Sequence, residues 1–184
     1  MKGKVVLITG ATSGIGMACA RRFAVGGYNL IITGRSADKL QALKAELEAG
    51  GVEVLALAFD VCNREATRDA VASIPDAFKP IDVLINNAGL ARGLEPEYEG
   101  DFQDWDEMID TNIKGLLNMT RFVVPGMVSL NHGHVINIGS VAGDAAYAGG
   151  GVYCATKAAV KALTDGLRID VAHTSVRVTN LKPG

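Results

Sequence analysis

The sequence predicts a single α/β domain in which helices cover both faces of a doubly wound parallel sheet. Short apolar segments rich in β-branched residues alternate with longer amphipathic segments along all 184 residues. Most of the short segments are almost continuously apolar, as expected of parallel strands that helices cover on both sides. Repeated strand–helix alternation implies right-handed crossovers, and ligands of such sheets bind beyond the carboxyl ends of the strands.

Six segments are predicted to form the strands of this sheet. In chain order they are Val5–Thr9, Asn29–Thr33, Val52–Phe59, Ile81–Ile85, His134–Gly139 and Val176–Leu181. Five amphipathic segments are predicted helices, namely Gly14–Gly27, Ser36–Gly50, Asn63–Ile74, Asp104–Leu130 and Gly150–His173. Asp104 and Glu107 have the spacing of a capping box, which predicts that the fourth helix begins at Asp104.

The composition is that of a globular protein and argues against several classes of function. Hydrophobic residues make up 48% of the chain and charged residues 21%, and the formal net charge is −2. So small a charge gives no reason to expect a nucleic acid or a membrane as partner, and no apolar run reaches membrane-spanning length. The three cysteines lack C-x-x-C spacing, and the histidines lack acidic or cysteine partners at ligand spacing. We expect a reduced, cytosolic protein with no metal site.

A glycine-rich segment joins the first strand to the first helix. Its glycines allow a tight turn and a close approach of the backbone to a pyrophosphate, and the following helix N-terminus favours anions. The spacing is G-x-x-x-G-x-G, one residue wider than the common G-x-G-x-x-G. Because the segment lies within a strand–helix–strand unit, it predicts a Rossmann-type dinucleotide site. The residues expected to contact the dinucleotide are Gly10, Thr12, Ser13, Gly14, Ile15 and Gly16.

Residues after the second and third strands bear on the choice of nucleotide. Arg35 and Ser36 follow the second strand, where recognition of a free ribose hydroxyl favours an acidic residue. The guanidinium of Arg35 suits a phosphate instead, which favours NADP over NAD. Asp60 and Val61 close the third strand. The Asp60 carboxylate either accepts from the adenine amino group or caps the helix near Asn63, and the sequence leaves both roles open.

The fourth strand leads into Asn86-Asn87-Ala88-Gly89. Its small residues would let a cofactor ribose lie close to the backbone, so Asn87, Ala88 and Gly89 are predicted to bind the dinucleotide. A turn in which the asparagine side chains satisfy the backbone is the alternative.

Tyr153 and Lys157 are four residues apart in the last predicted helix and therefore lie on one face. An ammonium beside a phenol favours the phenolate, which can take the proton of an alcohol as hydride leaves and return it in reverse. Ser140 follows the fifth strand, where its hydroxyl can bind a substrate oxygen, or can serve only a turn. Asn112 lies within a predicted helix, where asparagine is unfavourable unless it has a polar task or packs in the core.

Taken together, these residues resemble the classical short-chain dehydrogenase/reductase family along essentially the whole chain. The matching elements are the glycine segment, Asp60, Asn86–Gly89, Asn112, Ser140, Tyr153, Lys157 and the terminal Pro183-Gly184. The resemblance implies a catalytic tetrad of Asn112, Ser140, Tyr153 and Lys157. It also implies that Lys157 binds the nicotinamide ribose and that Pro183 and Gly184 lie beside the nicotinamide ring.

A narrower likeness, in Gly89–Pro96, Asp104-Trp105 and Tyr147–Gly150, is to the NADP-dependent 3-hydroxy acid dehydrogenases of that family. These act on serine, allo-threonine and similar 3-hydroxy acids. Members usually show two consecutive arginines after the second strand, whereas this chain has Arg35 followed by Ser36. The alternatives to this activity are a 3-oxoacyl thioester reductase and an inactive cofactor-binding module.

The resemblance also carries expectations about the whole molecule. Members of the family continue past the Pro-Gly turn with a substrate-covering loop, further helices and a last strand. Residues 1–184 are thus expected to form one dinucleotide-binding and catalytic domain that lacks this lid and strand. We further expect self-association, as a dimer or tetramer, through the two long predicted helices, Asp104–Leu130 and Gly150–His173.

Overall fold

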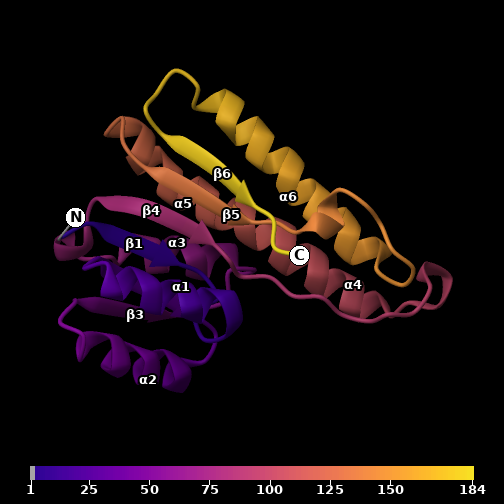
Figure 1. Cartoon of the computed structure of the whole chain (residues 1–184), viewed down its shortest axis with the longest axis horizontal. Helices are drawn as coiled ribbons and strands as arrows, with labels where there is room; N and C mark the ends of the chain where they lie inside the picture. The colour runs from indigo at the N-terminus through magenta and orange to yellow at the C-terminus, as the bar shows by residue number, and fades with distance from the viewer. Residues whose placement is uncertain (1–2) are drawn as a thin grey trace.

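The computed structural model describes residues 3–184 and contains a six-stranded sheet whose neighbouring strands are all parallel. The strand order is β3-β2-β1-β4-β5-β6, and Figure 1 shows β1, β4, β5 and β6 side by side. The strands are β1 (Val5–Ile8), β2 (Asn29–Gly34), β3 (Val54–Ala58), β4 (Ile81–Asn86), β5 (His134–Ile138) and β6 (Arg177–Leu181). The predicted fold class, a doubly wound parallel sheet of the Rossmann type, is confirmed.

Within the described part of the chain, six α-helices connect or flank these strands. They are α1 (Gly14–Val25), α2 (Ala37–Glu48), α3 (Arg64–Ala72), α4 (Phe102–Ile109), α5 (Leu116–Ser129) and α6 (Gly151–Asp170). Short 3₁₀ helices occur at Asp76–Phe78, Glu97–Glu99 and Val141–Gly143, and a π-helical segment, Asp110–Gly115, joins α4 to α5. Within residues 3–184, none of these helices has both the length and the apolar character needed to span a membrane.

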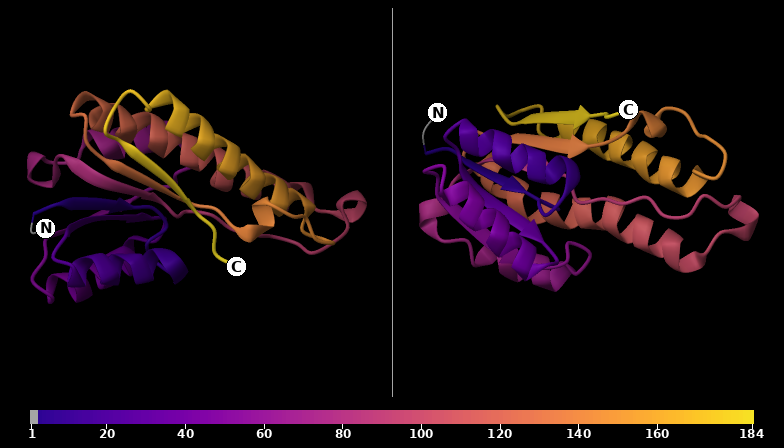
Figure 2. Two further views of the ribbon diagram at one scale, coloured as in Figure 1. Left: turned by 45° about the horizontal axis from the view of Figure 1, so that its top comes forward. Right: turned by 60° about the horizontal axis from the view of Figure 1, so that its bottom comes forward.

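The inner strands β1 and β2 are buried from both faces, which explains why their sequences are so continuously apolar. Along β1, Val5 and Leu7 belong to a core cluster with residues of α5, whereas Val6 and Ile8 belong to a second cluster with residues of α1 and α2. Figure 2 shows α1 and α2 on one face of the sheet and α5 and α6 on the opposite face. Chain order reverses at β1, where β2 lies on one side and β4 on the other. This switch point is where a doubly wound sheet opens a crevice for ligands.

The prediction of the fourth helix, Asp104–Leu130, is wrong in two respects. The helix begins at Phe102 rather than Asp104, because the Asp101 carboxylate accepts hydrogen bonds from the backbone N–H groups of Gln103 and Asp104 and so provides the cap. The capping box at Asp104 is therefore not formed. The predicted single helix is also interrupted by the π-helical turn Asp110–Gly115.

The other predicted helices and strands are present with ends shifted by a few residues. The third strand is shorter than predicted, and α3 begins at Arg64 because the Asn63 side chain accepts from the N–H of Ala66. Asn63, rather than Asp60, is thus the cap of this helix.

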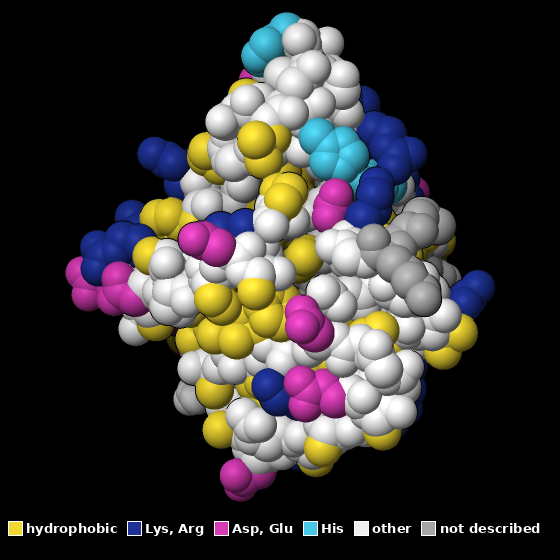
Figure 3. Space-filling view, turned by 90° about the vertical axis from the view of Figure 1, so that its left-hand side faces the viewer, with side chains coloured by type: hydrophobic (Ala, Val, Ile, Leu, Met, Phe, Trp, Pro, Cys, Tyr) yellow, Lys and Arg dark blue, Asp and Glu magenta, His cyan; other side chains and the backbone are white. Residues whose placement is uncertain are grey.

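The amino ends of the strands form the end of the molecule seen in Figure 3. Apolar side chains gather there around a groove between α3, the start of β4 and the end of α5, lined by residues that include Val71, Ile81 and Met127. The functional residues predicted above all follow the carboxyl ends of the strands or lie on helices at that opposite edge, so this end plays no part in the candidate site.

Candidate active site

A groove of about 290 Å³ lies at the carboxyl edge of the sheet, where β1, β2, β3 and β4 end. Most residues predicted to bind a dinucleotide line it: Gly10, Thr12, Ser13, Gly14, Ile15, Arg35, Asp60, Val61, Asn87, Ala88 and Gly89. Gly34, Phe59, Leu90 and Thr111 line it as well, without having been predicted. Segments from four different crossovers thus meet at one place.

In the first turn of α1, no side chain of the turn itself caps or neutralises the backbone N–H groups. Ser13 stands at the N-cap in an extended conformation but makes no capping hydrogen bond, and no acidic residue lies in the first turn. Gly14 has a φ of +50°, and no atom lies within 4 Å of where its Cβ would be. The turn is therefore open toward the groove and suited to an anionic group.

Gly16 contributes to this turn by packing rather than by lining the groove. A Cβ at this position would overlap the carbonyl oxygen of Gly10 and the side-chain amide of Asn87. The glycine allows α1 to lie directly against the turn that precedes it. The spacing of the glycine motif thus reflects two requirements, an open turn at Gly14 and close packing at Gly16.

Thr9, at the end of β1, connects the glycine turn to the end of β4. Its Oγ1 accepts from the N–H groups of Asn87 at 3.0 Å and Ala88 at 2.9 Å. The Asn87 amide donates in return to the carbonyl oxygens of Thr9 at 2.9 Å and Gly10 at 3.0 Å. The Asn87 side chain therefore satisfies a turn, and the groove is lined by the small residues beside it. Threonine is common in strands, so nothing in the sequence distinguished Thr9 as part of the site.

The residues that follow β2 and β3 differ in their roles. Arg35 lines the groove, whereas the Ser36 Oγ accepts from the N–H of Lys39 and caps α2 without lining the groove. Asp60 also lines the groove, and its Oδ1 accepts from the N–H of Cys62 at 2.9 Å. Since Asn63 caps α3, the capping role considered for Asp60 is excluded.

Tyr153 and Lys157 lie one turn apart in α6, with the Lys157 Nζ 5.7 Å from the centre of the Tyr153 ring. Lys157 is only 7% exposed, and its Nζ donates to the carbonyl oxygen of Ile138 at 2.9 Å. Burial lowers the pKa of the Lys157 ammonium below its ordinary value. A cation so placed is not a solvated side chain of a helix surface.

Asn112 is buried in the π-helical turn and fixes the loop after β4. Its Oδ1 accepts from the N–H of Leu90 at 2.8 Å, and its Nδ2 donates to the Leu90 carbonyl at 2.9 Å and to Thr156 Oγ1 at 3.0 Å. A Cβ on Gly89 would lie 3.0 Å from Asn112 Oδ1 and 3.6 Å from Lys157 Nζ. Asn112, Lys157 and the end of the β4 loop therefore meet at one point.

Ser140 lies in a loop that is held on two sides. Its Oγ accepts from the N–H of Ala142, which leaves the hydroxyl hydrogen free to donate. Gly143 in the same loop lies so close to α6 that a Cβ would be 2.7 Å from the carbonyl carbon of Lys157. On the other side, the N–H of Val141 donates to the Pro183 carbonyl at 3.1 Å. The loop thereby ties the end of the chain to the catalytic helix.

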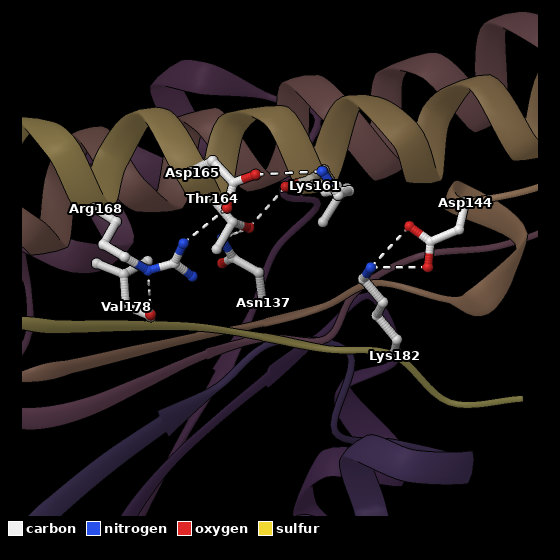
Figure 4. A network of polar contacts seen from close by, with 9 residues as sticks. Asn137, Asp144, Lys161, Thr164, Asp165, Arg168, Val178 and Lys182 are labelled. Carbon is white, nitrogen blue, oxygen red and sulfur yellow. Dashed lines mark hydrogen bonds and ion pairs between the residues drawn. The ribbon is translucent and has the colours of Figure 1, made fainter.

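Three polar contacts beneath and beside this loop were not predicted. Asn86 Nδ2 donates to Asn137 Oδ1 at 2.9 Å, and Asn137 Nδ2 donates to Thr164 Oγ1 of α6 at 2.9 Å. Figure 4 shows Asn137 beneath Thr164, and farther along the helix the ion pair of Lys182 with Asp144, at 2.8 Å to each carboxylate oxygen. The matching strand-end positions of Asn86 and Asn137 are the signal that could have revealed the first contact.

The profile of the short chain dehydrogenase family matches residues 4–184. The chain therefore belongs to the short-chain dehydrogenase/reductase family.

Within this family, the chain is similar to several dehydrogenases of known name. Over 180 residues the chain is 54% identical to an NADP-dependent 3-hydroxy acid dehydrogenase of Salmonella typhi, a match that covers 98% of this chain and 71% of the relative. It is 48% identical over 179 residues to serine 3-dehydrogenase of Rhizobium radiobacter, covering 97% and 70%. A solved structure of serine dehydrogenase, in a closed form with NADP+, is 51% identical with a TM-score of 0.94, covering 98% and 71%. The resemblance stated from the sequence is confirmed at the level of the family.

Proposed function

We propose that this protein is an NADP-dependent dehydrogenase that oxidises the hydroxyl carbon of a small 3-hydroxy acid, with serine as the first substrate to test. The observation that carries the proposal is the buried Lys157 one helical turn from Tyr153, beside the glycine-lined groove. The names of relatives about half identical to this chain support both the cofactor and the substrate class.

The groove suits a dinucleotide with an additional phosphate. The open first turn of α1, with Gly10, Thr12, Ser13, Gly14 and Ile15, would hold the pyrophosphate. Arg35 would bind the 2′-phosphate, and Asp60 and Val61 would lie at the adenine. The remaining contacts, to the nicotinamide and its ribose, would come from Asn87, Ala88, Gly89, Tyr153, Lys157, Pro183 and Gly184. When bound there, NADP+ would supply the acceptor for the hydride that leaves the substrate carbon.

Tyr153 acts in this proposal as the acid and base. Its phenolate oxygen accepts the proton of the substrate hydroxyl during oxidation and returns it to the carbonyl oxygen during reduction. The Ser140 hydroxyl, free to donate, binds the same substrate oxygen. The Lys157 ammonium favours the phenolate by its charge, and Asn112 keeps the Gly89–Leu90 loop against that ammonium.

A substrate panel followed by the absorbance of NADPH tests the proposed activity. We expect oxidation of L-serine, L-allo-threonine and 3-hydroxy acids without an amino group, and no reduction of acetoacetyl thioesters. Reduction of thioesters without oxidation of any 3-hydroxy acid would instead indicate a 3-oxoacyl thioester reductase. Tight binding of NADPH in calorimetry, with no turnover of any substrate, would indicate an inactive cofactor-binding protein.

Replacing Arg35 with alanine should weaken NADPH binding and leave NADH binding almost unchanged. A hydrogen bond to a charged group contributes about 1.5–3 kcal/mol, so the Kd for NADPH should rise by roughly 10- to 100-fold. Isothermal titration with both cofactors measures the difference.

Ser36→Ala is the matched control, because the Ser36 side chain caps α2 and does not line the groove. It should lower stability by about 1 kcal/mol without altering either Kd. An unchanged preference for NADPH in Arg35→Ala would refute the phosphate role of Arg35.

A further inference from the structure

The two loop segments that carry the narrower resemblance pack against each other at the start of α6. Gly149 has a φ of +72°, and a Cβ there would overlap the backbone carbonyl oxygen of Leu94 in the loop after β4. The Leu94 carbonyl carbon and Cα would lie only 2.9 and 3.3 Å from such a Cβ. Since the neighbour is backbone rather than the tip of a flexible side chain, a side chain at position 149 would push the loop away.

Two further glycines at the start of α6 are packed just as closely against neighbouring residues. A Cβ on Gly150 would overlap the Tyr147 ring, and one on Gly151 would overlap the Glu97 carboxylate. The helix has no capping side chain of its own, because Gly150 stands at its N-cap and no acidic residue lies in its first turn. The loop after β4 therefore covers the unprotected helix end, two residues before Tyr153.

The loop is held along its length as well as at this point. Its beginning is fixed by the two hydrogen bonds between Leu90 and Asn112. Near its end, a Cβ on Gly100 would lie 2.7 Å from the ring of Trp105. A cavity of about 20 Å³ remains between loop, α4 and α6, with Tyr153 and Trp105 in its wall, which is room for about one water.

We propose that Gly149 is a positioning residue, whose lack of a side chain lets the loop after β4 dock on the first turn of α6 and hold Tyr153 in its reactive place. This rests on the proposed function, which assigns Tyr153 as the acid and base. The dinucleotide groove lies elsewhere and includes no residue of 147–151. Gly149 can therefore affect the cofactor only through Tyr153, and we expect its main effect on the chemical step.

Gly149→Ala tests this role. A displacement of about 1 Å at a reacting group can lower a rate by about 10²-fold, so we expect kcat to fall by roughly 10- to 100-fold. The Kd for NADPH should stay at the value of the unaltered protein. Gly149→Asn should lose as much activity: asparagine accepts a positive φ more readily, yet it carries the same obstructing Cβ.

Two matched controls distinguish the effect of the clash with the loop from the effect of backbone strain at a positive φ. Gly51→Ala imposes a comparable backbone strain at φ +86°, where no atom lies within 4 Å of the Cβ. Gly166→Ala places the same side chain in α6, also in open space. Both should keep the kcat of the unaltered protein. Equal kcat in Gly149→Asn and the unaltered protein would overturn the proposal, as would an equal loss of NADPH affinity and kcat in Gly149→Ala.

The fluorescence of Trp105, the only tryptophan in the chain, reports loop docking without any turnover. We expect its emission to move to longer wavelength in Gly149→Ala and Gly149→Asn, and to stay unchanged in the two controls. An unchanged emission in both Gly149 variants would overturn the docking on which the proposal depends. If the emission shifts in the Gly149 variants but even the unaltered protein shows no turnover, the docking of the loop is supported. The proposed function would then be refuted, and the role of Gly149 in positioning Tyr153 with it.

Discussion

Tyr153→Phe is expected to abolish most of the turnover while leaving the cofactor bound with nearly unchanged affinity. The substitution removes one oxygen atom, and general acid–base catalysis contributes about 10²- to 10⁴-fold to rate, so kcat should fall by that factor. The Kd for NADPH should change by no more than about twofold, because the ring and the adjacent Lys157 remain. Steady-state kinetics with serine, together with calorimetry for NADPH, measures both quantities.

Tyr98→Phe is the matched control for this experiment. Tyr98 is 85% exposed in the loop after β4, and the same loss of a hydroxyl there should leave kcat unchanged. If Tyr153→Phe retained the activity of the control, the phenol could not be the proton acceptor. If it lost cofactor affinity and turnover alike, a general disturbance of the site would be the better explanation.

Lys157→Met should damage both turnover and cofactor binding, which distinguishes it from Tyr153→Phe. Loss of a charged group that stabilises the developing phenolate should lower kcat by roughly 10²- to 10³-fold. Loss of the proposed contact to the nicotinamide ribose should raise the Kd for NADPH by roughly 10-fold or more. Normal NADPH affinity in this variant would exclude the ribose contact and leave only the electrostatic role.

The same variant should reveal a dependence of stability on pH. Burial lowers the pKa of Lys157 in the folded protein below its ordinary value of 10.5, so the unfolded chain binds this proton more tightly than the folded chain. The free energy of unfolding of the unaltered protein should thus rise, relative to Lys157→Met, as pH increases from the lowered pKa toward 10.5. Urea denaturation of both proteins at several pH values measures this difference, and a parallel pH dependence would contradict it.

The sheet could be predicted from the sequence because its signals are local and repeated. The inner strands, such as β1 and β2, are buried on both faces and appear as short, nearly unbroken apolar runs between amphipathic segments. The interruption between α4 and α5 could not be predicted, since a π-helical turn has no local sequence signature. The start of α4 was misplaced because several acidic residues near Asp101 offer equally good caps.

The candidate site was predictable in its residue types and not in its contacts. The glycine segment, Arg35 and the Tyr153–Lys157 pair were found because their spacing has a chemical meaning. The hydrogen bond from Lys157 to Ile138 and the packing of Leu94 on Gly149 join residues far apart in the chain. Such contacts depend on how loops from different strands meet at one edge, which no local pattern specifies.

The widened turn Asp110–Gly115 has a consequence for how the molecule moves. A π-turn bonds its backbone over a longer span than the α-helical turns on either side, so it is one place, with Pro125 in α5, where the helices α4 and α5 can bend relative to each other. Asn112 sits on that compliant turn and holds Leu90 with both ends of its amide. A bend at this turn would therefore displace Leu90 and with it the loop after β4, which packs on the start of α6.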